Sequence, residues 1–382
     1  MARLAFGTAS ALGLGRFAYG LILPAMRGEL GWSLAQAGGL TTANALGYLI
    51  GAMATAHVAH RLGVTATFRL GMVLTAAALA ATAVTGSYAV LLLTRAATGL
   101  AGALVFITGG VIASHSAARA RSAAPLAVYY VGAGLGIVAS GAAIPTLLGH
   151  HPGRWQLAWV GLAVAGCLAT VISWTAARGN YGTGTAPTFA DARTVVRLWQ
   201  PALAYLLFSA GYIAYITFLS AYLTSQHASV DQITLTWTVL GLAAVASPAL
   251  WSRPIGTWPR ASALALLLAA LSAAAVAALA GTPLAVTGSA IGYGATFLAV
   301  PAAVTGLIRT ATPPGQWTGA LAAFTVVFAV GQTAGPYLSG VLADRFGTGA
   351  ILAWTAALCA AGSVLSGLTR EARSGSPAEP RR

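Results

Sequence analysis

The chain alternates apolar runs with short polar joints along almost its whole length. Each run has about 20 residues, enough to cross the ~30 Å hydrocarbon core of a bilayer as one helix. Glycine, proline and arginine mark the joints between the runs. The pattern predicts twelve membrane-spanning helices, at residues 4–26, 36–58, 68–86, 88–113, 123–148, 155–176, 201–224, 232–250, 261–280, 284–309, 317–342 and 348–369.

Composition agrees with a membrane location, since 58% of the residues are hydrophobic and only 7% are charged. Soluble domains carry about 25% charged residues. The apolar run from Leu4 lacks a small-residue cleavage site, so we interpret it as the first spanning helix and not as a signal peptide. The chain is therefore expected to be an all-α integral membrane protein.

The basic residues indicate how the chain is oriented. All twenty are arginine, and they are scattered singly, which does not suggest a nucleic-acid surface. With the N-terminus placed inside, fifteen arginines fall in inner segments, while Arg27, Arg154 and Arg345 fall outside. Because positive loops stay in the cytoplasm, both termini are expected there, in a bacterial inner (plasma) membrane.

The longest internal connection, residues 177–200, divides the predicted spans into two sets of six. We interpret it as a cytoplasmic central loop between an N-terminal six-helix bundle, residues 1–176, and a C-terminal six-helix bundle, residues 201–370. Residues 371–382 are short and polar and are expected to form a disordered cytoplasmic tail.

The two halves are repeats of each other. Gly15, Ala18 and Tyr19 of the first span recur as Gly211, Ala214 and Tyr215 of the seventh. Leu-Ala-Trp at 157–159 recurs at 352–354, and the glycine pattern of the fifth span recurs in the eleventh, all at nearly the same offset. Parallel six-span repeats with a site between them near the midplane are typical of secondary transporters.

Several motifs resemble those of the major facilitator superfamily. Arg95 and Gly99, in LLLTRAATGL, resemble its fourth-helix motif, and residues 132–145 resemble its glycine-rich fifth-helix motif. Residues 60–63, HRLG, resemble its D-R-x-G loop with histidine at the aspartate position. More narrowly, residues 13–26 (GLGRFAYGLILPAM) and 43–52 (ANALGYLIGA) resemble the YbfB/YjiJ-type branch.

This resemblance implies two pseudo-symmetric six-helix halves that alternate in access around a central cavity. Spans 1, 4, 7 and 10 line that cavity in the family. The resemblance and the close helix packing that glycine permits assign gating or packing roles to a set of small and loop residues: Gly99, Gly132, Gly136, Gly141, Gly335, Pro336, Arg61 and Gly63.

Two arginines fall inside predicted spans. Arg16 lies about 12 residues into the first span, or ~18 Å, and Arg95 lies about 8 residues into the fourth, or ~12 Å. The six acidic residues all fall in predicted loops, tails or helix ends, so neither arginine has a predicted counterion. Charges at membrane depth mark functional sites, and a guanidinium binds carboxylates in two-pronged fashion. The pair predicts a cavity for an organic anion.

Other polar side chains are candidates for the same site. Tyr19, Tyr212 and Tyr215 are predicted to form an amphipathic wall beside Arg16, or to pack as ordinary aromatic residues. Asn44, Tyr48 and Gln332 are candidate substrate-binding residues, with hydrogen bonding between helices as the alternative. For Arg95 the alternative is helix packing or coupling, and for Arg16 it is hydrogen bonding to neighbouring helices.

The sequence thus predicts a secondary active or facilitative transporter of a small organic molecule, expected to be an organic anion. The alternative is efflux of neutral or hydrophobic drugs or metabolites, with both arginines structural. A coupling proton would have to travel with the substrate or through His115, because no acid lies within a span. We expect a monomer without cofactor or metal. We also expect no enzymatic activity, since the sole candidate catalytic dyad, His227 and Asp231, lies beside a predicted outer loop without further polar partners.

Overall fold

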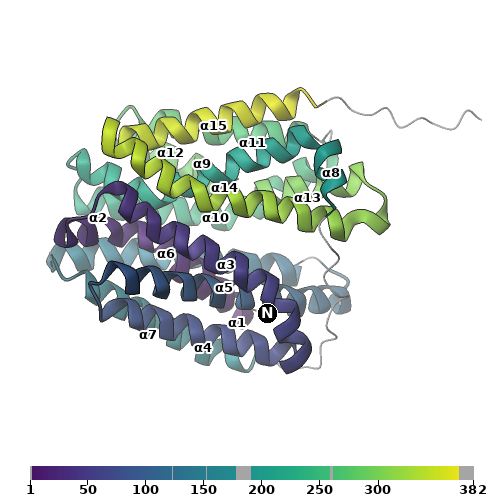
Figure 1. Ribbon diagram of the computed structural model, residues 1–382, viewed down its shortest axis with the longest axis horizontal. Coiled ribbons are helices and arrows are strands. Elements are labelled where there is room, and N and C mark those ends of the chain that lie inside the picture. Colours follow the sequence, from purple (N-terminus) through teal and green to yellow (C-terminus); the bar gives the residue numbers. More distant parts are fainter. Residues whose placement is uncertain (1, 123, 152, 178–190, 259–260, 370–382) are drawn as a thin grey trace, which may run out of the picture.

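The computed structural model describes residues 2–122, 124–151, 153–177, 191–258 and 261–369. Over these ranges the chain is helical, with short turns and no strand. The predicted all-α membrane fold is therefore confirmed. Figure 1 shows two stacked helical bundles, the N-terminal one in purple and blue and the C-terminal one in green and yellow.

The N-terminal bundle contains α1 (Ala2–Thr8), a π-helix η1 (Ala9–Phe17), α2 (Tyr19–Leu30), α3 (Leu34–Leu62), α4 (Val64–Ala83), α5 (Tyr88–Ala120), α6 (Ala124–His150) and α7 (Trp155–Trp174). The short α8 (Ala192–Arg197) lies in the predicted central loop, and most of the rest of that loop falls outside the described residues.

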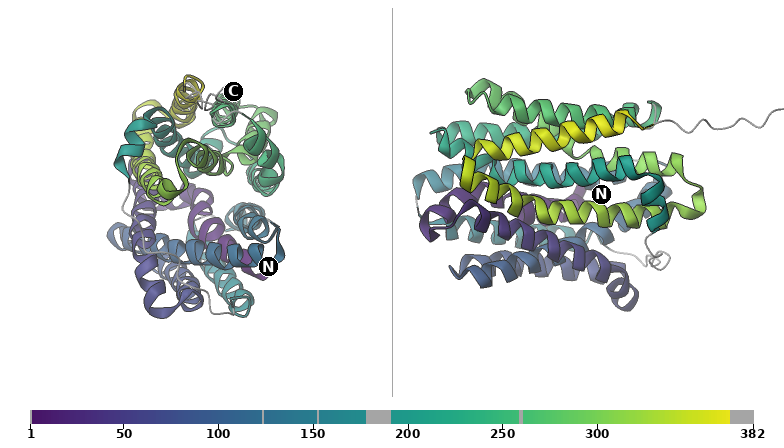
Figure 2. Two further views of the ribbon diagram at one scale, coloured as in Figure 1. Left: turned by 90° about the vertical axis from the view of Figure 1, so that its right-hand side faces the viewer. Right: turned by 45° about the horizontal axis from the view of Figure 1, so that its top comes forward.

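The C-terminal bundle contains α9 (Trp199–Ser225), α10 (Val230–Thr257), α11 (Ser262–Ala278), α12 (Pro283–Phe297), α13 (Val300–Ala311), a 3-10 turn η2 (Pro314–Gln316), α14 (Trp317–Phe346) and α15 (Gly349–Gly367). Figure 2 shows the same two groups of helices from one end of the molecule. The predicted tail, residues 371–382, lies outside the described residues.

Within the described ranges, ten helical stretches are long and apolar enough to span a membrane. Two further helices complete the predicted set of twelve. One is α11, which is apolar but shorter. The other is α3, which has 29 residues but interrupts its apolar positions with Thr41, Thr42 and Asn44.

Several helices continue past their predicted ends. Arg61 and Arg119 lie in the last turns of α3 and α5, and Arg253 lies within α10 before its last turn, so none of the three is in a loop as predicted. Hydropathy detects the segment within hydrocarbon, whereas backbone hydrogen bonds continue the helix into the interfacial layer.

The first span is not a uniform α-helix. Its middle segment, η1, is a π-helix of nine residues, and the Ala18 amide donates to the Gly13 carbonyl at 3.0 Å, closing a five-residue turn. Such segments often occur at functional sites. Arg16 lies in the last turn of this π-helix.

A tight turn reverses the chain between the first two spans. Gly31 ends α2 with a φ of 68°, a left-handed conformation that glycine adopts without a Cβ clash. The Ser33 side chain then accepts from the Gln36 amide while the Gln36 side chain accepts from the Ser33 amide. This capping box fixes where α3 begins.

The two bundles meet along a seam formed mainly by α3 against α14 and α6 against α10. The approach at Gly38 is very close, because a Cβ there would lie 2.3 Å from the Pro336 carbonyl oxygen. Between α6 and α10, a Cβ at Gly141 would lie 2.7 Å from the Cβ of Trp237. These glycines let backbones of opposite bundles touch.

The seam is held at the end of the molecule that carries Asp344, hereafter the Asp344 end. The Asp344 carboxylate accepts from the backbone amides of Leu34 at 2.7 Å and Ala35 at 3.0 Å, so it caps α3 from the opposite bundle. Thr42 of α3 donates to the Thr333 carbonyl of α14 at 2.7 Å. Further along α3, Gly47 and Gly51 lie against α5 of their own bundle.

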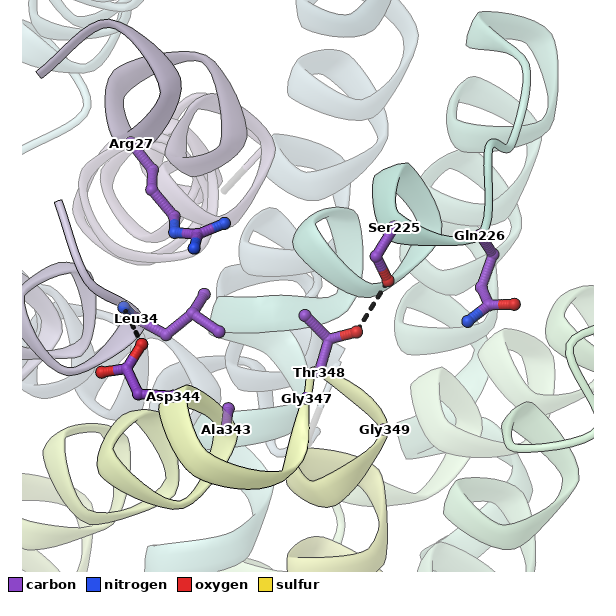
Figure 3. Close-up of a pocket in the computed structure, with 9 residues that line it drawn as sticks. All are labelled: Arg27, Leu34, Ser225, Gln226, Ala343, Asp344, Gly347, Thr348 and Gly349. Carbon is purple, nitrogen blue, oxygen red and sulfur yellow. Dashed lines mark hydrogen bonds between the residues drawn. The ribbon is translucent and has the colours of Figure 1, made fainter. Parts of the chain in front are cut away.

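A polar cavity of about 500 Å³ opens at this end, lined by Arg27, Leu34, Ser225, Gln226, Ala343, Asp344, Gly347, Thr348 and Gly349. Figure 3 shows Asp344 against Leu34, and Ser225 joined to Thr348 by a 2.7 Å hydrogen bond. The cavity lies over the seam, between the ends of α2, α9 and α14.

Candidate functional site

Arg16 bridges the two bundles. Its side chain is 8% exposed. Its Nη2 donates to the Tyr212 hydroxyl at 3.1 Å and to the Gln332 side-chain oxygen. Tyr212 belongs to α9 and Gln332 to α14, so both acceptors lie in the C-terminal bundle. The structure thus joins three of the predicted site residues around one guanidinium.

The charge of Arg16 is not neutralised by these contacts. Both acceptors are uncharged, and the buried Nε has no hydrogen-bond partner among the described residues. The described acids near a helix end, such as Asp344 and Asp231, cap or begin helices and do not enter the middle of a span. An unneutralised guanidinium at this depth is expensive and favours binding of an anion.

Aromatic rings surround Arg16. Its guanidinium lies over the Tyr48 ring at 5.7 Å, a geometry of cation–π attraction. On the other side, the Tyr212 ring stacks on Phe208 at 4.9 Å and on Phe328 at 5.7 Å. The site therefore combines one cation with an apolar lining, the combination that small-molecule sites use.

Arg95 occupies a different environment, inside the N-terminal bundle. It is 1% exposed, and its guanidinium lies over the rings of Tyr19 at 5.3 Å and Trp159 at 5.2 Å. Its buried Nε and Nη1 have no partner among the described residues. The Tyr19 ring beneath Arg95 belongs to the same span as Arg16, three residues further along the chain. Among the described residues, no hydrogen bond or cation–π contact joins the Arg95 guanidinium to the C-terminal bundle.

Tyr19 and Tyr215 do not form the predicted wall with Arg16. The Tyr19 hydroxyl donates to the Ala37 carbonyl at 2.8 Å, and its ring stacks on Trp159. The change from π-helix to α-helix after Phe17 breaks the regular three-residue spacing that would place Tyr19 beside Arg16.

Tyr215 is separated from Arg16 because it faces α12. Its ring stacks on Tyr293 with centroids 3.7 Å apart, and its hydroxyl pairs with Ser289 at 2.7 Å. The repeat mates Tyr19 and Tyr215 are thus packing residues, each within its own bundle. The repeat mates Arg16 and Tyr212, by contrast, touch across the seam.

The two amides have different roles. The Asn44 Nδ2 donates to the Arg95 carbonyl at 3.1 Å, which is the alternative of hydrogen bonding between helices. Gln332, which is 1% exposed, directs its oxygen at Arg16 and so combines an inter-helix bond with a place in the candidate site.

Most of the predicted gating glycines pack within a bundle and not between bundles. A Cβ at Gly132 would meet the Ala5 carbonyl at 2.0 Å, and one at Gly136 would meet that of Ala9 at 2.7 Å. Gly335 lies equally close to Ala210, and Gly99 to Asn44. These four glycines therefore pack against spans 1, 7 and 2 of their own bundles, and a gating role for them stays a prediction.

The remaining gating candidates divide between the seam and a helix end. Gly141 and the Pro336 carbonyl lie at the seam, as described above. Arg61 is exposed in the last turn of α3, and Gly63 ends that helix with a φ of 84°. Both therefore belong to a helix junction away from the seam contacts around Gly38.

The sequence analysis did not identify the aromatic rings that surround Tyr212 in the C-terminal bundle, or the helix cap made by Asp344. Tyr205, Phe208 and Tyr212 recur with a spacing of three and four, which predicts one face of α9. Phe324 and Phe328 have the same spacing on α14. These spacings were a usable signal, whereas nothing local to Asp344 indicates a bond to α3.

Comparisons with known proteins agree with this architecture. The family described as "Uncharacterised MFS-type transporter YbfB" matches residues 8–370. Among solved structures, the nucleoside transporter NupG superposes with a TM-score of 0.71 at 14% identity, covering 96% of this chain and 97% of that one.

A NupG point mutant gives a TM-score of 0.72 at 12% identity, covering 96% and 98% of the two chains. The human organic anion transporter MFSD10 (TETRAN) gives 0.65 at 16%, covering 95% and 99%. At these identities the likeness shows the fold. No curated protein sequence matches the chain.

Proposed function

Because this chain belongs to the YbfB-type family of major facilitator superfamily transporters, we propose that it moves a small organic anion across the membrane by alternating access. Membership of that family also confirms the resemblance drawn from residues 13–26 and 43–52. The observation that carries the proposal is Arg16, a buried guanidinium that bridges the bundles and has only neutral hydrogen-bond partners.

Arg16 is the proposed anchor for the anion. A carboxylate that enters the site would compete with the Gln332 oxygen for the guanidinium, because a charged acceptor forms the stronger hydrogen bond. Exchange of Gln332 for the substrate would break one of the two hydrogen bonds that Arg16 makes to the C-terminal bundle. Substrate binding would thereby favour the movement that exposes the site to the other side, as alternating access requires.

Arg95 is proposed to act without touching the substrate. The rings of Tyr19 and Trp159 hold this second positive charge against the span that carries Arg16. In a medium of low dielectric constant, that charge raises the positive potential of the site over several ångströms. This proposal changes the predicted role of Arg95 from ligand to source of potential.

We also propose an orientation and an access state. The arginine distribution supports an Asp344 end on the outer side, because Arg27 and Arg345 are among the few arginines at that end and most arginines lie at the other. Both termini would then lie in the cytoplasm of a bacterial cell. The bonds of Asp344 and Thr42 close the seam on that side. In this state the substrate would reach Arg16 from the cytoplasm. We further propose that the chain works as a monomer, in which bundles 1–176 and 201–370 rock about Arg16.

The fold alone does not determine the cargo, since the solved structures that share it include a nucleoside transporter and an organic anion transporter. The second candidate, efflux of a neutral or hydrophobic compound, is favoured by one observation. The two bonds of Arg16 to the C-terminal bundle would also suit a purely structural role. The two functions differ in whether a ligand must carry negative charge.

Thermal stabilisation of the purified protein separates them. A ligand that binds only the folded state raises the unfolding temperature with its concentration. We expect small carboxylates to stabilise the wild type and Arg95→Met, but not Arg16→Met, while neutral compounds of the same shape have little effect. Equal stabilisation of wild type and Arg16→Met by neutral compounds would establish efflux of neutral cargo instead.

A further inference from the structure

The rings around Arg16 form two facing walls. The C-terminal wall consists of Tyr205, Phe208, Tyr212 and Phe328, whose neighbouring rings are nearly parallel. Phe208 and Tyr212 are inclined by 16°, Tyr212 and Phe328 by 25°, and Tyr205 and Phe328 by 29°. Tyr205, Phe208 and Tyr212 are buried against one another, whereas Phe328 is half-buried and carries the accessible ring surface of this wall.

The opposite wall comes from the N-terminal bundle. Tyr48 lies beside Phe106 at 6.4 Å, and Phe106 lies beside Tyr130 at 5.5 Å. The Tyr48 ring faces Arg16, and Arg16 in turn bonds to Tyr212 of the first wall. The guanidinium therefore lies where the two walls meet.

Both walls extend from Arg16 away from the Asp344 end. Phe328 precedes Gln332 on α14, and Phe208 precedes Tyr212 on α9, by four residues each, or about 6 Å. The closed part of the seam, around Gly38 and Asp344, lies on the other side. Tyr48, Phe106 and Phe328 are only half-buried, so ring surface remains accessible here.

We infer that the cargo is a planar aromatic carboxylate, with its carboxylate on Arg16 and its ring against the C-terminal wall. This inference rests on the proposed function and names its substrate class. Ring stacking adds to affinity beyond buried area. An aromatic acid is therefore expected to bind roughly two- to tenfold more tightly than a saturated acid of the same size and charge.

The test compares benzoate, cyclohexanecarboxylate and benzyl alcohol as ligands of the full-length protein in nanodiscs. Dissociation constants are measured by titration of thermal stability and by calorimetry. Benzoate and cyclohexanecarboxylate share ring size and charge and differ in planarity, while benzyl alcohol keeps the aromatic ring without the charge. We expect benzoate to bind about fivefold more tightly than cyclohexanecarboxylate, and benzyl alcohol most weakly.

Phe328→Leu removes a wall ring but keeps apolar volume. It should weaken benzoate more than cyclohexanecarboxylate and so erase the preference for benzoate. Phe346→Leu, on the same helix but 73% exposed near the Asp344 end, is the matched control and should keep the preference. Tyr48→Leu, from the opposite wall, provides a second variant should Phe328→Leu fail to fold.

The outcomes distinguish this inference from the proposed function. If the wild type binds both acids equally, or if neither ring variant alters the preference, the aromatic class is wrong while organic-anion binding stands. If neither acid binds and benzyl alcohol does, both the aromatic-acid inference and the proposed anion transport fail.

Discussion

The two buried arginines look alike in the sequence and differ in the structure. Arg16 lies at the seam and bonds to side chains of the opposite bundle. Arg95 lies within the N-terminal bundle, between the rings of Tyr19 and Trp159. A buried charge alone therefore does not define a binding site. In the proposed mechanism, the position of the charge relative to the two bundles decides whether it can link substrate binding to their movement.

Removal of each charge in turn tests whether the two arginines have different roles. Arg16→Met should weaken carboxylate binding by roughly ten- to a hundredfold, because it removes charged hydrogen bonds. Arg95→Met should weaken binding by less than about threefold, through lost potential only. Calorimetry with benzoate measures both. An Arg95→Met loss as large as that of Arg16→Met would assign both arginines to the site, as the sequence predicted.

A second variant addresses the competition between Gln332 and the substrate. Gln332→Leu leaves Arg16 with one of its two acceptors, the Tyr212 hydroxyl, which should lower the stability of the unliganded protein by about 1–3 kcal/mol. A bound carboxylate replaces the lost acceptor, so the affinity should rise about fivefold.

Unfolding temperatures with and without benzoate test this effect, with Thr333→Val as the neighbouring control on α14. A lower affinity of Gln332→Leu would mean that Gln332 binds the substrate directly instead of competing with it.

A third variant opens the seam from its closed end without touching either arginine. Asp344→Ala removes the cap on α3 supplied by the opposite bundle. Loss of a helix cap costs about 1 kcal/mol, so the population open at the Asp344 end should rise about fivefold.

The distance between spin labels at Gly28 and Gly288 reports this opening, since both positions have open space for a side chain. The labels require a Cys167→Ala background, because Cys167 is exposed. Asp231→Ala, a change of the exposed acid in the first turn of α10, should leave the distance distribution unchanged.

The smallest effect is expected at the hydroxyl of Tyr19. Tyr19→Phe removes its bond to the Ala37 carbonyl and keeps the ring under Arg95. Stability should fall by about 1 kcal/mol, with no change in carboxylate affinity. Denaturation and calorimetry on one preparation check both, and an altered affinity would return Tyr19 to the binding site.

The family and the span pattern were accessible from the sequence because both depend on local order. Apolar runs of membrane length determine where helices lie. The repeat of Gly15, Ala18 and Tyr19 at Gly211, Ala214 and Tyr215 is visible at a fixed offset along the chain and needs no contacts to be seen. The depth of Arg16 and Arg95 likewise follows from counting residues along a helix.

Which side chains meet was decided only by the tertiary structure. The π-helix before Ala18 separates Tyr19 from Arg16, and a regular helical wheel does not anticipate it. Gly132 and Gly141 belong to one glycine pattern, yet one packs within its bundle and the other across the seam. Sequence determined that two positive charges would be buried. The packing of two bundles determined that Arg16 alone bonds to Tyr212 and Gln332, because those partners lie far away in the chain.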